Sequence, residues 1–424
     1  MLTLKTIREE KEKVINRLKI KNFDAGEIVE KIIEIDDKRR EIQFKKDNNQ
    51  KELNDISKRI GILYSQGKRE EAEILKEETA ILKEQIKILE NDFNLAETEL
   101  NNLIVLLPNL PHESVAAGKG ADDNLIVKTG GLIPVLEEKK AHWDLIREYD
   151  IIDFEMGVKI TGAGFPVYKG KGAKLQRALI SFFLDEAEKS GYVEVLPPLM
   201  VNQDSGFGTG QLPDKEGQMY HVIEDNLYLI PTAEVPVTNI YRDVILSDKD
   251  FPIKNCAYSA CFRREAGSWG AHVRGLNRLH QFDKVEIVQI RKPEDSYQAL
   301  DEMVAHVESL VAKLGLPYRI VKLCGGDMSF TSALTYDFEV FSAAQERWLE
   351  VSSVSNFEEF QANRLKLRYK SDSDKKTKLA HTLNGSALAL PRIMAALLEN
   401  NQTKQGIKIP EVIVKYTGFE FITK

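Results

Sequence analysis

The chain has 424 residues, of which 42% are hydrophobic and 29% charged, and its net charge is −7. So long a chain exceeds one ordinary hydrophobic core, and two or more domains are expected. The negative charge argues against nonspecific nucleic-acid binding by the whole surface, although it leaves room for local basic patches.

Neither the apolar runs nor the cysteines indicate export or a membrane. The longest apolar run, Leu103–Leu107, is far too short to span a bilayer, and the charged first residues do not form an export signal. Cys256, Cys261 and Cys324 form no C-x-x-C pair and no Cys/His cluster, which predicts buried thiols in a reducing compartment. We therefore expect a cytoplasmic protein with no membrane partner.

Two heptad seams follow each other in the first hundred residues. They predict two long helices that reverse at Ser65–Lys68 and pack as an antiparallel coiled coil from about residue 27 to 101. At 1.5 Å per residue, Glu27–Ser65 would be roughly 58 Å long, too long to lie on a small globule, so a projecting arm is expected. The seam positions are Ile28, Ile32, Ile35, Arg39, Ile42, Lys46, Asn49, Leu53, Ile56, Ile60 and Leu63, then Ala72, Leu75, Thr79, Leu82, Ile86, Leu89, Phe93, Ala96, Leu100 and Leu103.

The first of these helices carries clustered basic residues at positions 38–40, 45–46 and 58–59, whereas the second is acidic. A basic face suits the phosphates of an RNA. A solvated coiled-coil surface or a dimerisation device explains the arm equally well, so the arm alone does not decide its role. Three polar residues stand where apolar seam residues belong and should weaken the middle of the arm: Arg39, Lys46 and Asn49.

Beyond the arm the pattern changes to mixed helix and strand. The prolines of Leu107–His112 end the second long helix, and residues 114–131, rich in Gly and Asp, read as a linker. An amphipathic helix is predicted at Lys174–Ser190. It is followed by a strand at Gly191–Val201, whose Pro197–Pro198 pair suits an edge or an interface. Strands joined by hairpins rather than βαβ units predict an α+β domain with a mainly antiparallel sheet flanked by helices.

A hairpin is the segment most informative about function. Its strands are predicted at Ala257–Arg263 and His280–Ile290, joined by a glycine-rich loop at Gly267–Gly275. Arginine forks suit phosphate and carboxylate oxygens, and an aromatic ring offers a stacking face for a base. Charges that gather at the strand mouths favour a nucleotide site over an exposed hairpin with a solvated tip. These side chains are Arg263, Glu265, Arg274, Arg278 and Glu286, together with the ring of Phe282.

Three further segments extend the sheet. Tyr228–Pro236 is predicted as a short strand leading into a turn, and Trp348–Ser353 as another strand. Asn384–Leu398 begins as a strand and becomes a helix at Pro391, because proline is favoured at the first helical position.

In this order, these segments resemble the signature motifs of class II aminoacyl-tRNA synthetases, in the form found in the bacterial-type seryl-tRNA synthetase family. Gly191–Met200 matches the first motif, Phe262–Glu286 the second and Gly385–Arg392 the third. Thr232–Glu234 matches the family's serine loop, and Glu350–Ser353 its metal-and-ATP strand. The arm is a further hallmark, and the likeness covers essentially the whole chain. The departures from the family pattern are Arg264, Trp269, Ala271 and His272.

The resemblance implies that the chain activates L-serine with ATP and transfers serine to the 3′ end of tRNA(Ser), with tRNA(Sec) left open as a second acceptor. The implied catalytic residues are Arg263, which would bridge the α-phosphate and the serine carboxylate, and Arg392, which would sandwich the adenine with Phe282. The implied ATP site comprises Arg263, Arg264, Glu265, Leu279, His280, Gln281, Phe282, Glu350, Val351, Ser352, Ser353 and Arg392.

The implied serine site comprises Thr232, Ala233, Glu234, Arg263, Glu286 and Ser386. Thr232 and Glu234 would take the ammonium, while Glu286 and Ser386 would take the hydroxyl; the division between the two glutamates is left open. Such a pocket rejects alanine, because its own polar groups would be left unpaired. Glu350 and Ser353 would be oxygen ligands of Mg²⁺.

The resemblance also implies an N-terminal tRNA-binding domain at residues 1–106, a catalytic domain at 107–424, and a homodimer built on Gly191–Val201. Two other classes of protein are less compatible with the sequence. A ligase that loads a carrier protein typically lacks the long arm. A structural coiled-coil protein with an inert head would have no reason to keep the set Arg263, Glu286, Glu350 and Arg392.

Overall fold

The computed structural model describes residues 1–214, 216–265, 273–371 and 376–424. Trp269, Ala271 and His272 of the predicted hairpin loop lie outside these ranges. The chain divides into two compact units, one of residues 1–19 and 23–108 and the other of residues 20–22 and 109–424. None of the helices in the described ranges is long and apolar enough to cross a membrane.

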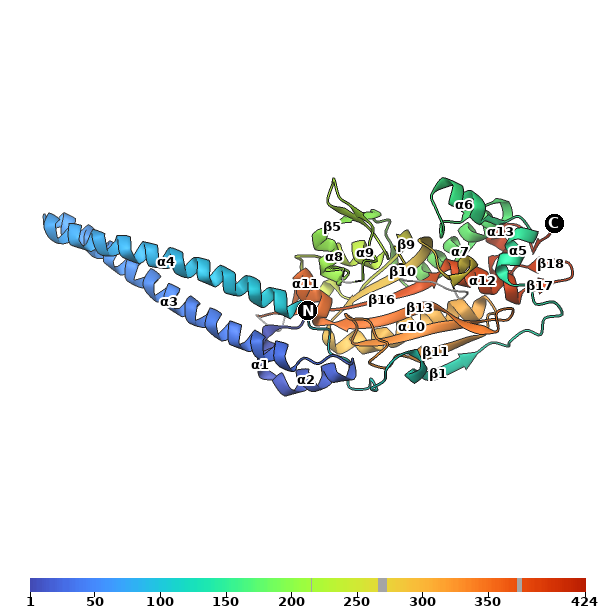
Figure 1. Cartoon of the computed structure of the whole chain (residues 1–424), viewed down its shortest axis with the longest axis horizontal. Helices are drawn as coiled ribbons and strands as arrows, with labels where there is room; N and C mark the ends of the chain where they lie inside the picture. Colours follow the sequence, from blue (N-terminus) through green and yellow to red (C-terminus); the bar gives the residue numbers. More distant parts are fainter. Residues whose placement is uncertain (215, 266–272, 372–375) are drawn as a thin grey trace. The chain divides into compact units, whose positions relative to one another are not determined.

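The first unit is helical. Two short helices, α1 (Leu4–Glu9) and α2 (Lys11–Ile20), precede two long ones, α3 (Gly26–Ser65) and α4 (Arg69–Ile104), which run antiparallel side by side (Figure 1). Gly67 in the turn between the long helices has a φ of 77°, a conformation that favours glycine. Every predicted seam position is buried or half-buried, so the antiparallel hairpin is confirmed.

Polar side chains within the seam have partners. The Arg39 guanidinium and the Lys46 ammonium lie 5.7 Å and 5.0 Å from the centre of the Phe93 ring. Asp36, which the seam pattern does not include, is fully buried. Its carboxylate is paired with Arg8, Arg39 and Arg40. A buried carboxylate without such partners would be costly, so these arginines are part of the packing of the unit.

The second unit is built on an eight-stranded sheet with the order β1-β11-β12-β13-β16-β10-β9-β4. Neighbouring strands are antiparallel except β4 with β9, which confirms the predicted α+β fold with a mainly antiparallel sheet. In sheet order the strands are Leu125–Gly130, Tyr318–Lys322, Leu334–Ser342, Arg347–Glu358, His381–Ala389, Gln281–Arg291, Ile253–Phe262 and Val193–Glu194.

The helices and smaller sheets surround this sheet (Figure 1). The helices are α5 (His142–Glu148), α6 (Phe154–Ile160), α7 (Gly170–Lys189), α8 (Gln203–Thr209), α9 (Glu234–Asn239), α10 (Ser296–Lys313), α11 (Glu359–Leu365), α12 (Leu390–Asn400) and α13 (Glu411–Thr417). The strands of the smaller sheets are β2 (Ile152–Asp153), β3 (Val167–Tyr168), β5 (Met200–Asn202), β6 (His221–Val222), β7 (Leu227–Leu229), β8 (Ile245–Ser247), β14 (Arg368–Lys370), β15 (Thr377–Leu379), β17 (Gln402–Thr403), β18 (Gly406–Lys408) and β19 (Phe421–Ile422).

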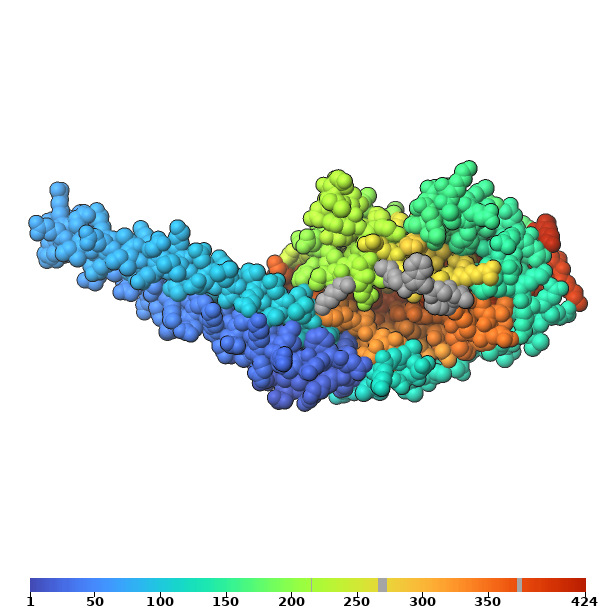
Figure 2. Space-filling model, viewed as in Figure 1, coloured from blue at the N-terminus to red at the C-terminus, as the bar shows by residue number. Residues whose placement is uncertain are grey.

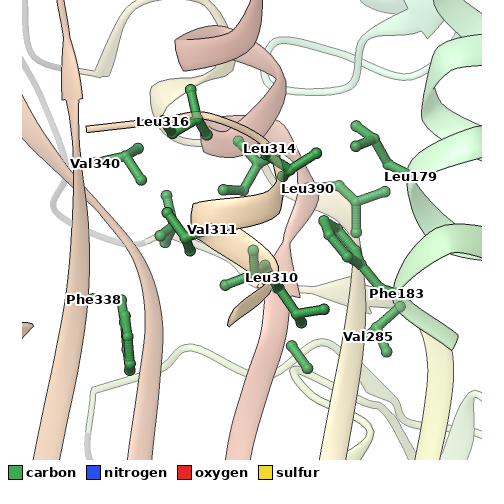
Figure 3. Packing of buried hydrophobic residues seen from close by; sticks show 14 of the residues in the cluster. Leu179, Phe183, Val285, Leu310, Val311, Leu314, Leu316, Phe338, Val340 and Leu390 are labelled. Carbon is green, nitrogen blue, oxygen red and sulfur yellow. The ribbon is translucent and has the colours of Figure 1, made fainter. Parts of the chain in front are cut away.

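The main core lies between one face of the large sheet and the helices α7, α10 and α12. Leu179 and Phe183 of α7 share a buried cluster with Val285 of β10 and Leu310 of α10 (Figure 3). Burying a side chain of this size contributes about 1.5–3 kcal/mol. Because successive residues of a strand point to opposite faces, the residues between these apolar ones face the other side of the sheet, where polar side chains gather.

Three local predictions are wrong. The predicted linker at 114–131 contains β1, which pairs with β11. The predicted strand at Gly191–Val201 is two strands, β4 and β5, in different sheets. The Pro197–Pro198 pair between them has no backbone N–H to give to a ladder, which is why one strand cannot continue. After Tyr228, the strand β7 leads into a helix, α9, rather than a turn.

Candidate active site

Two buried glutamates mark the polar face of the sheet. Glu286 lies in the middle of β10, in register with Ser386 of β16, and not at the predicted strand mouth. Glu234 begins α9. Thr232 connects the two, because its Oγ1 donates to Glu286 Oε2 at 3.1 Å and accepts from the Glu234 backbone N–H at 3.2 Å. The structure thus brings the predicted serine-site residues together.

Two further side chains belong to this cluster and were not predicted. Lys284 Nζ lies 2.6 Å from Glu286 Oε2, and the two side chains are only 7% and 2% exposed. Gln361 of α11 donates to Glu234 Oε1 at 2.6 Å and accepts from the hydroxyl of Thr382 at 2.7 Å. Both side chains hold a glutamate in place, and nothing in the local sequence marks either one as buried.

Burial raises the pKa of Glu234 to about 7, and the charge of Glu286 acts in the same direction. The hydrogen bond from Gln361 opposes this rise. A ligand cation placed beside Glu234 would favour its charged form. The cluster is therefore suited to a small ligand that carries an ammonium group together with a hydroxyl.

Arg263 forms the wall beside this cluster. It follows β9, and its guanidinium lies over the Phe282 ring, 5.2 Å from the ring centre. Its Nε donates to the carbonyl of Pro231 at 3.4 Å, directly before Thr232. Figure 2 shows a recess in the orange surface of the second unit, to which β12 and β13 belong. An arginine and an aromatic ring at this place can receive an anionic group and a planar base.

His280 fixes the start of β10. Its backbone N–H donates to the carbonyl of Gly164 at 3.0 Å, and its Nδ1 lies 3.0 Å from the Tyr220 hydroxyl. Its ring stacks on Phe165 with the ring centres 5.4 Å apart. A Cβ on Gly164 would come within 2.3 Å of the imidazole, and Gly164 has a φ of 82°, so only glycine fits. The histidine therefore fixes the position of the start of β10, which carries Phe282.

Arg392 closes the other end of the site. Its Nε donates to the carbonyl of Asn277 at 3.0 Å, and its Nη1 donates to the carbonyl of Glu350 at 2.7 Å. These two bonds set the plane of the guanidinium. The side chain is still 31% exposed, so part of it is accessible to a ligand.

A β-bulge places Glu350 and Ser353 on the same side of the sheet. Residues three apart in a regular strand face opposite sides. In this pair of strands the register between β12 and β13 shifts, so that Asp337 lies opposite Ser353 and Glu339 opposite Glu350. Since Asp337 and Glu339 are two apart on β12, both of their partners face the same way. The predicted metal ligands are thus brought together.

The residues at this bulge fit a divalent cation. Asp337 Oδ1 is buried and has no hydrogen-bond partner within the described residues. Burial, together with the charge of Glu350, raises the pKa of Asp337 well above its usual range. The described ranges contain no group of three or more His, Cys, Asp or Glu side chains that could hold a metal. Mg²⁺ commonly takes only one or two protein carboxylates, with phosphate oxygens and water completing its shell.

The other predicted site residues lie in different environments. Ala233, Leu279, Val351 and Ser352 are buried, while Arg264 and Gln281 are exposed. Glu265 is ion-paired with Arg278. The three cysteines, Cys256, Cys261 and Cys324, are free and buried, which confirms their predicted place in the core.

Two family descriptions match the chain. The "Seryl-tRNA synthetase N-terminal domain" matches residues 1–111, which include both long helices. The "tRNA synthetase class II core domain (G, H, P, S and T)" matches residues 220–401, which include the glutamates, Arg263 and Arg392.

Relatives match over nearly the full length. A serine–tRNA ligase of Salinibacter ruber is 51% identical, over 99% of this chain and 98% of that protein. One of Akkermansia muciniphila is 46% identical, over 100% and 99%. The crystal structure of seryl-tRNA synthetase from Pyrococcus horikoshii complexed with ATP has a TM-score of 0.93 at 33% identity, and covers 100% of this chain and 99% of that chain. The chain belongs to the serine–tRNA ligase family and has both its N-terminal domain and a class II synthetase core.

Proposed function

We propose that this chain is a serine–tRNA ligase, which activates L-serine with ATP and transfers the seryl group to the 3′ end of tRNA(Ser). The observation that carries the proposal is the cluster of Thr232, Glu234, Glu286 and Ser386 beside Arg263. It offers carboxylates and hydroxyls to the ammonium and the hydroxyl of serine, and an arginine to its carboxylate. The ATP bound in the Pyrococcus horikoshii relative supports ATP as the second substrate.

Serine would be recognised by all three of its polar groups. Glu234 and Thr232 take the ammonium, and Glu286 and Ser386 take the hydroxyl. Lys284 holds the Glu286 side chain in place through its 2.6 Å contact. Alanine would leave the buried Glu286 without the hydrogen bond that serine donates. Leaving a buried polar group unpaired costs more free energy than a hydrogen bond to it normally contributes, so alanine should bind much more weakly than serine.

The first reaction is an in-line displacement. A serine carboxylate oxygen bonds to the α-phosphorus of ATP, the bond from that phosphorus to the α,β-bridging oxygen breaks, and pyrophosphate leaves. Arg263 stands where negative charge develops, and Phe282 and Arg392 hold the adenine between a ring and a guanidinium plane. Positioning and charge neutralisation account for most of such catalysis.

Glu350 and Ser353 would hold Mg²⁺, with the unpaired oxygen of Asp337 beside them. When bound, the ion neutralises charge on the phosphates. The remaining positioning falls to the protein: the Arg392 Nη1 bond to the Glu350 carbonyl ties this strand to the proposed adenine site.

The helical unit would bind the tRNA. We assign residues 1–106 to tRNA binding and 107–424 to catalysis, because the N-terminal family description covers residues 1–111. The basic clusters of α3 at 38–40, 45–46 and 58–59 suit the backbone of tRNA(Ser), which is recognised by shape and phosphates rather than by base edges. The role implies a cytoplasmic location, where charged tRNA is used, and tRNA(Sec) is a second acceptor to test.

A C2 homodimer would cover an exposed apolar strip. Val193, Leu196, Leu199 and Met200 are exposed large hydrophobic residues of the segment Gly191–Val201. Several exposed large hydrophobic residues in one short segment often mark an interface. Sedimentation at micromolar concentration should give a dimer, and a fully active monomer would contradict the assignment.

Charging of purified tRNA(Ser) with radiolabelled serine tests the proposed function. The unaltered protein should charge this tRNA in the presence of ATP and Mg²⁺. Arg263→Ala should lower the rate about 10²–10³-fold, the usual loss for one donor at a developing charge. If the unaltered protein did not charge the tRNA, the proposed function would be wrong, and normal charging by Arg263→Ala would contradict the role assigned to this arginine.

A further inference from the structure

Arg392 depends on a short turn for its orientation. The carbonyl that accepts its Nε hydrogen bond, at 3.0 Å, belongs to Asn277. Asn277 ends a 3₁₀ turn, Gly275–Asn277, that precedes β10. Whatever fixes this turn therefore also fixes the plane of the guanidinium.

His142 of α5 fixes the turn from the buried side. The backbone N–H of Leu276 donates to His142 Nε2 at 2.9 Å. Since Nε2 accepts, Nδ1 carries the ring proton and donates it to Glu399 Oε1 at 2.7 Å. Both the imidazole and the carboxylate are 0% exposed. Gly275 has a φ of 66°, and a Cβ there would come within 2.3 Å of Nε2, so the close approach of His142 requires glycine.

Glu399 and Arg392 are on the same helix, α12, and seven residues apart. Seven residues are almost two full turns, so both side chains lie along one side of the helix. The turn is thus tied to that side at two points, by Arg392 directly and by Glu399 through His142. Gln345 adds a second bridge, because its Nε2 donates to Glu399 at 2.9 Å and its Oε1 accepts from Asn277 Nδ2 at 2.9 Å.

We propose that His142 and Glu399 are positioning residues for ATP: they hold the Gly275–Asn277 turn and, through the Asn277 carbonyl, the Arg392 plane on which the adenine stacks. The inference rests on the proposed function, because it takes Arg392 as an adenine ligand. Within the described residues, the hydrogen bonds of His142, Glu399 and Gln345 do not reach Thr232, Glu234, Glu286 or Ser386. Loss of the His142–Glu399 pair should therefore weaken binding of ATP and not binding of serine.

Serine-dependent ATP–pyrophosphate exchange separates the two substrates. His142→Leu removes both hydrogen bonds at similar volume, whereas His142→Gln keeps an acceptor for the Leu276 N–H. His142→Leu should raise KM for ATP about tenfold, the worth of about one buried hydrogen bond, and change KM for serine less than about twofold. His142→Gln should fall in between. His381→Leu is the matched control, because His381 is also buried and its Nδ1 lies 2.8 Å from the Ser296 hydroxyl, at the start of β16. It should leave both KM values unchanged.

Calorimetric titration with ATP tests whether His142 acts through Arg392. In an Arg392→Met background, His142→Leu should cause no further loss of ATP affinity, because coupled residues are not additive. An equal rise of both KM values, or the same tenfold loss in the Arg392→Met background, would overturn the inference. If His142→Leu does not fold, His142→Gln carries the same comparison. No serine-dependent exchange by the unaltered protein would overturn the proposed function instead.

Discussion

Replacing Lys284 by methionine should destabilise the catalytic unit and impair serine activation, and these two losses should separate in a double variant. Methionine occupies about the volume of the lysine stem but leaves Glu286 buried without its cation. Breaking a buried ion pair by removing one partner typically costs about 3–5 kcal/mol. Thr232 Oγ1 still donates to Glu286, so the lower end of this range is expected.

Urea unfolding at one fixed protein concentration measures the stability, and pyrophosphate exchange measures the function. Lys284→Met/Glu286→Leu should regain most of the lost stability, because an apolar pair is often as stable as a buried ion pair. It should still lack serine-dependent exchange, because Glu286 is gone. The matched control is Lys404→Met, which breaks an exposed pair with Glu137 and should change the free energy of unfolding by no more than about 1 kcal/mol.

Two results would refute this reasoning. A Lys284→Met protein as stable as the Lys404→Met control would show that the ion pair contributes nothing to the packing of β10. A double variant that activates serine normally would show that Glu286 does not contact the substrate.

Glu234 should make serine binding depend on pH, because its pKa is about 7 and its carboxylate becomes protonated as the pH falls. KM for serine should therefore be about tenfold higher at pH 6 than at pH 8. Glu234→Gln should show no such dependence of KM on pH. Because of the same raised pKa, the folded state binds the Glu234 proton more tightly than the unfolded state does. The contribution of Glu234 to the free energy of unfolding should therefore fall as the pH rises from about 4.5 to 7. Urea unfolding across that pH range checks this. Glu350→Gln and Asp337→Asn should each weaken Mn²⁺ binding in the presence of ATP about tenfold or more, as measured by electron paramagnetic resonance. Unchanged Mn²⁺ affinity in both variants would show that the metal does not bind at this bulge. Deleting residues 28–100 should abolish charging of tRNA(Ser) but leave pyrophosphate exchange. Binding of the tRNA to the full chain should weaken steeply as the salt concentration rises. Normal charging by the shortened protein would show that the arm has a structural role only.

The elements that can be predicted from local sequence are those with a repeating apolar pattern or with a proline or glycine that marks their end. The heptad seams of α3 and α4 recur every three or four residues, and each seam position is buried or half-buried in the structure. The change from β16 to α12 is marked by Pro391, which lies in the first turn of the helix. The β9–β10 hairpin follows from two apolar strands around a glycine-rich loop.

Contacts between distant segments were not predictable in this way. Lys284 and Glu286 flank Val285 as solvent-facing residues would, and it is the neighbouring strand β16 and the helix α9 that bury them. Glu350 and Ser353 share a face only because the register with β12 shifts. His142 lies 134 residues from Leu276 and 257 from Glu399 along the chain. Such pairings depend on tertiary structure, which one sequence does not display.

We propose that the cluster around Glu286 recognises serine by its hydroxyl as well as its ammonium. ATP–pyrophosphate exchange measured with each of the protein amino acids tests it most directly. Serine should support exchange, and alanine should be less effective by about 10⁴-fold, because a site that hydrogen-bonds a hydroxyl is left unpaired without it. Comparable exchange with alanine, or exchange with another amino acid in place of serine, would contradict the claim.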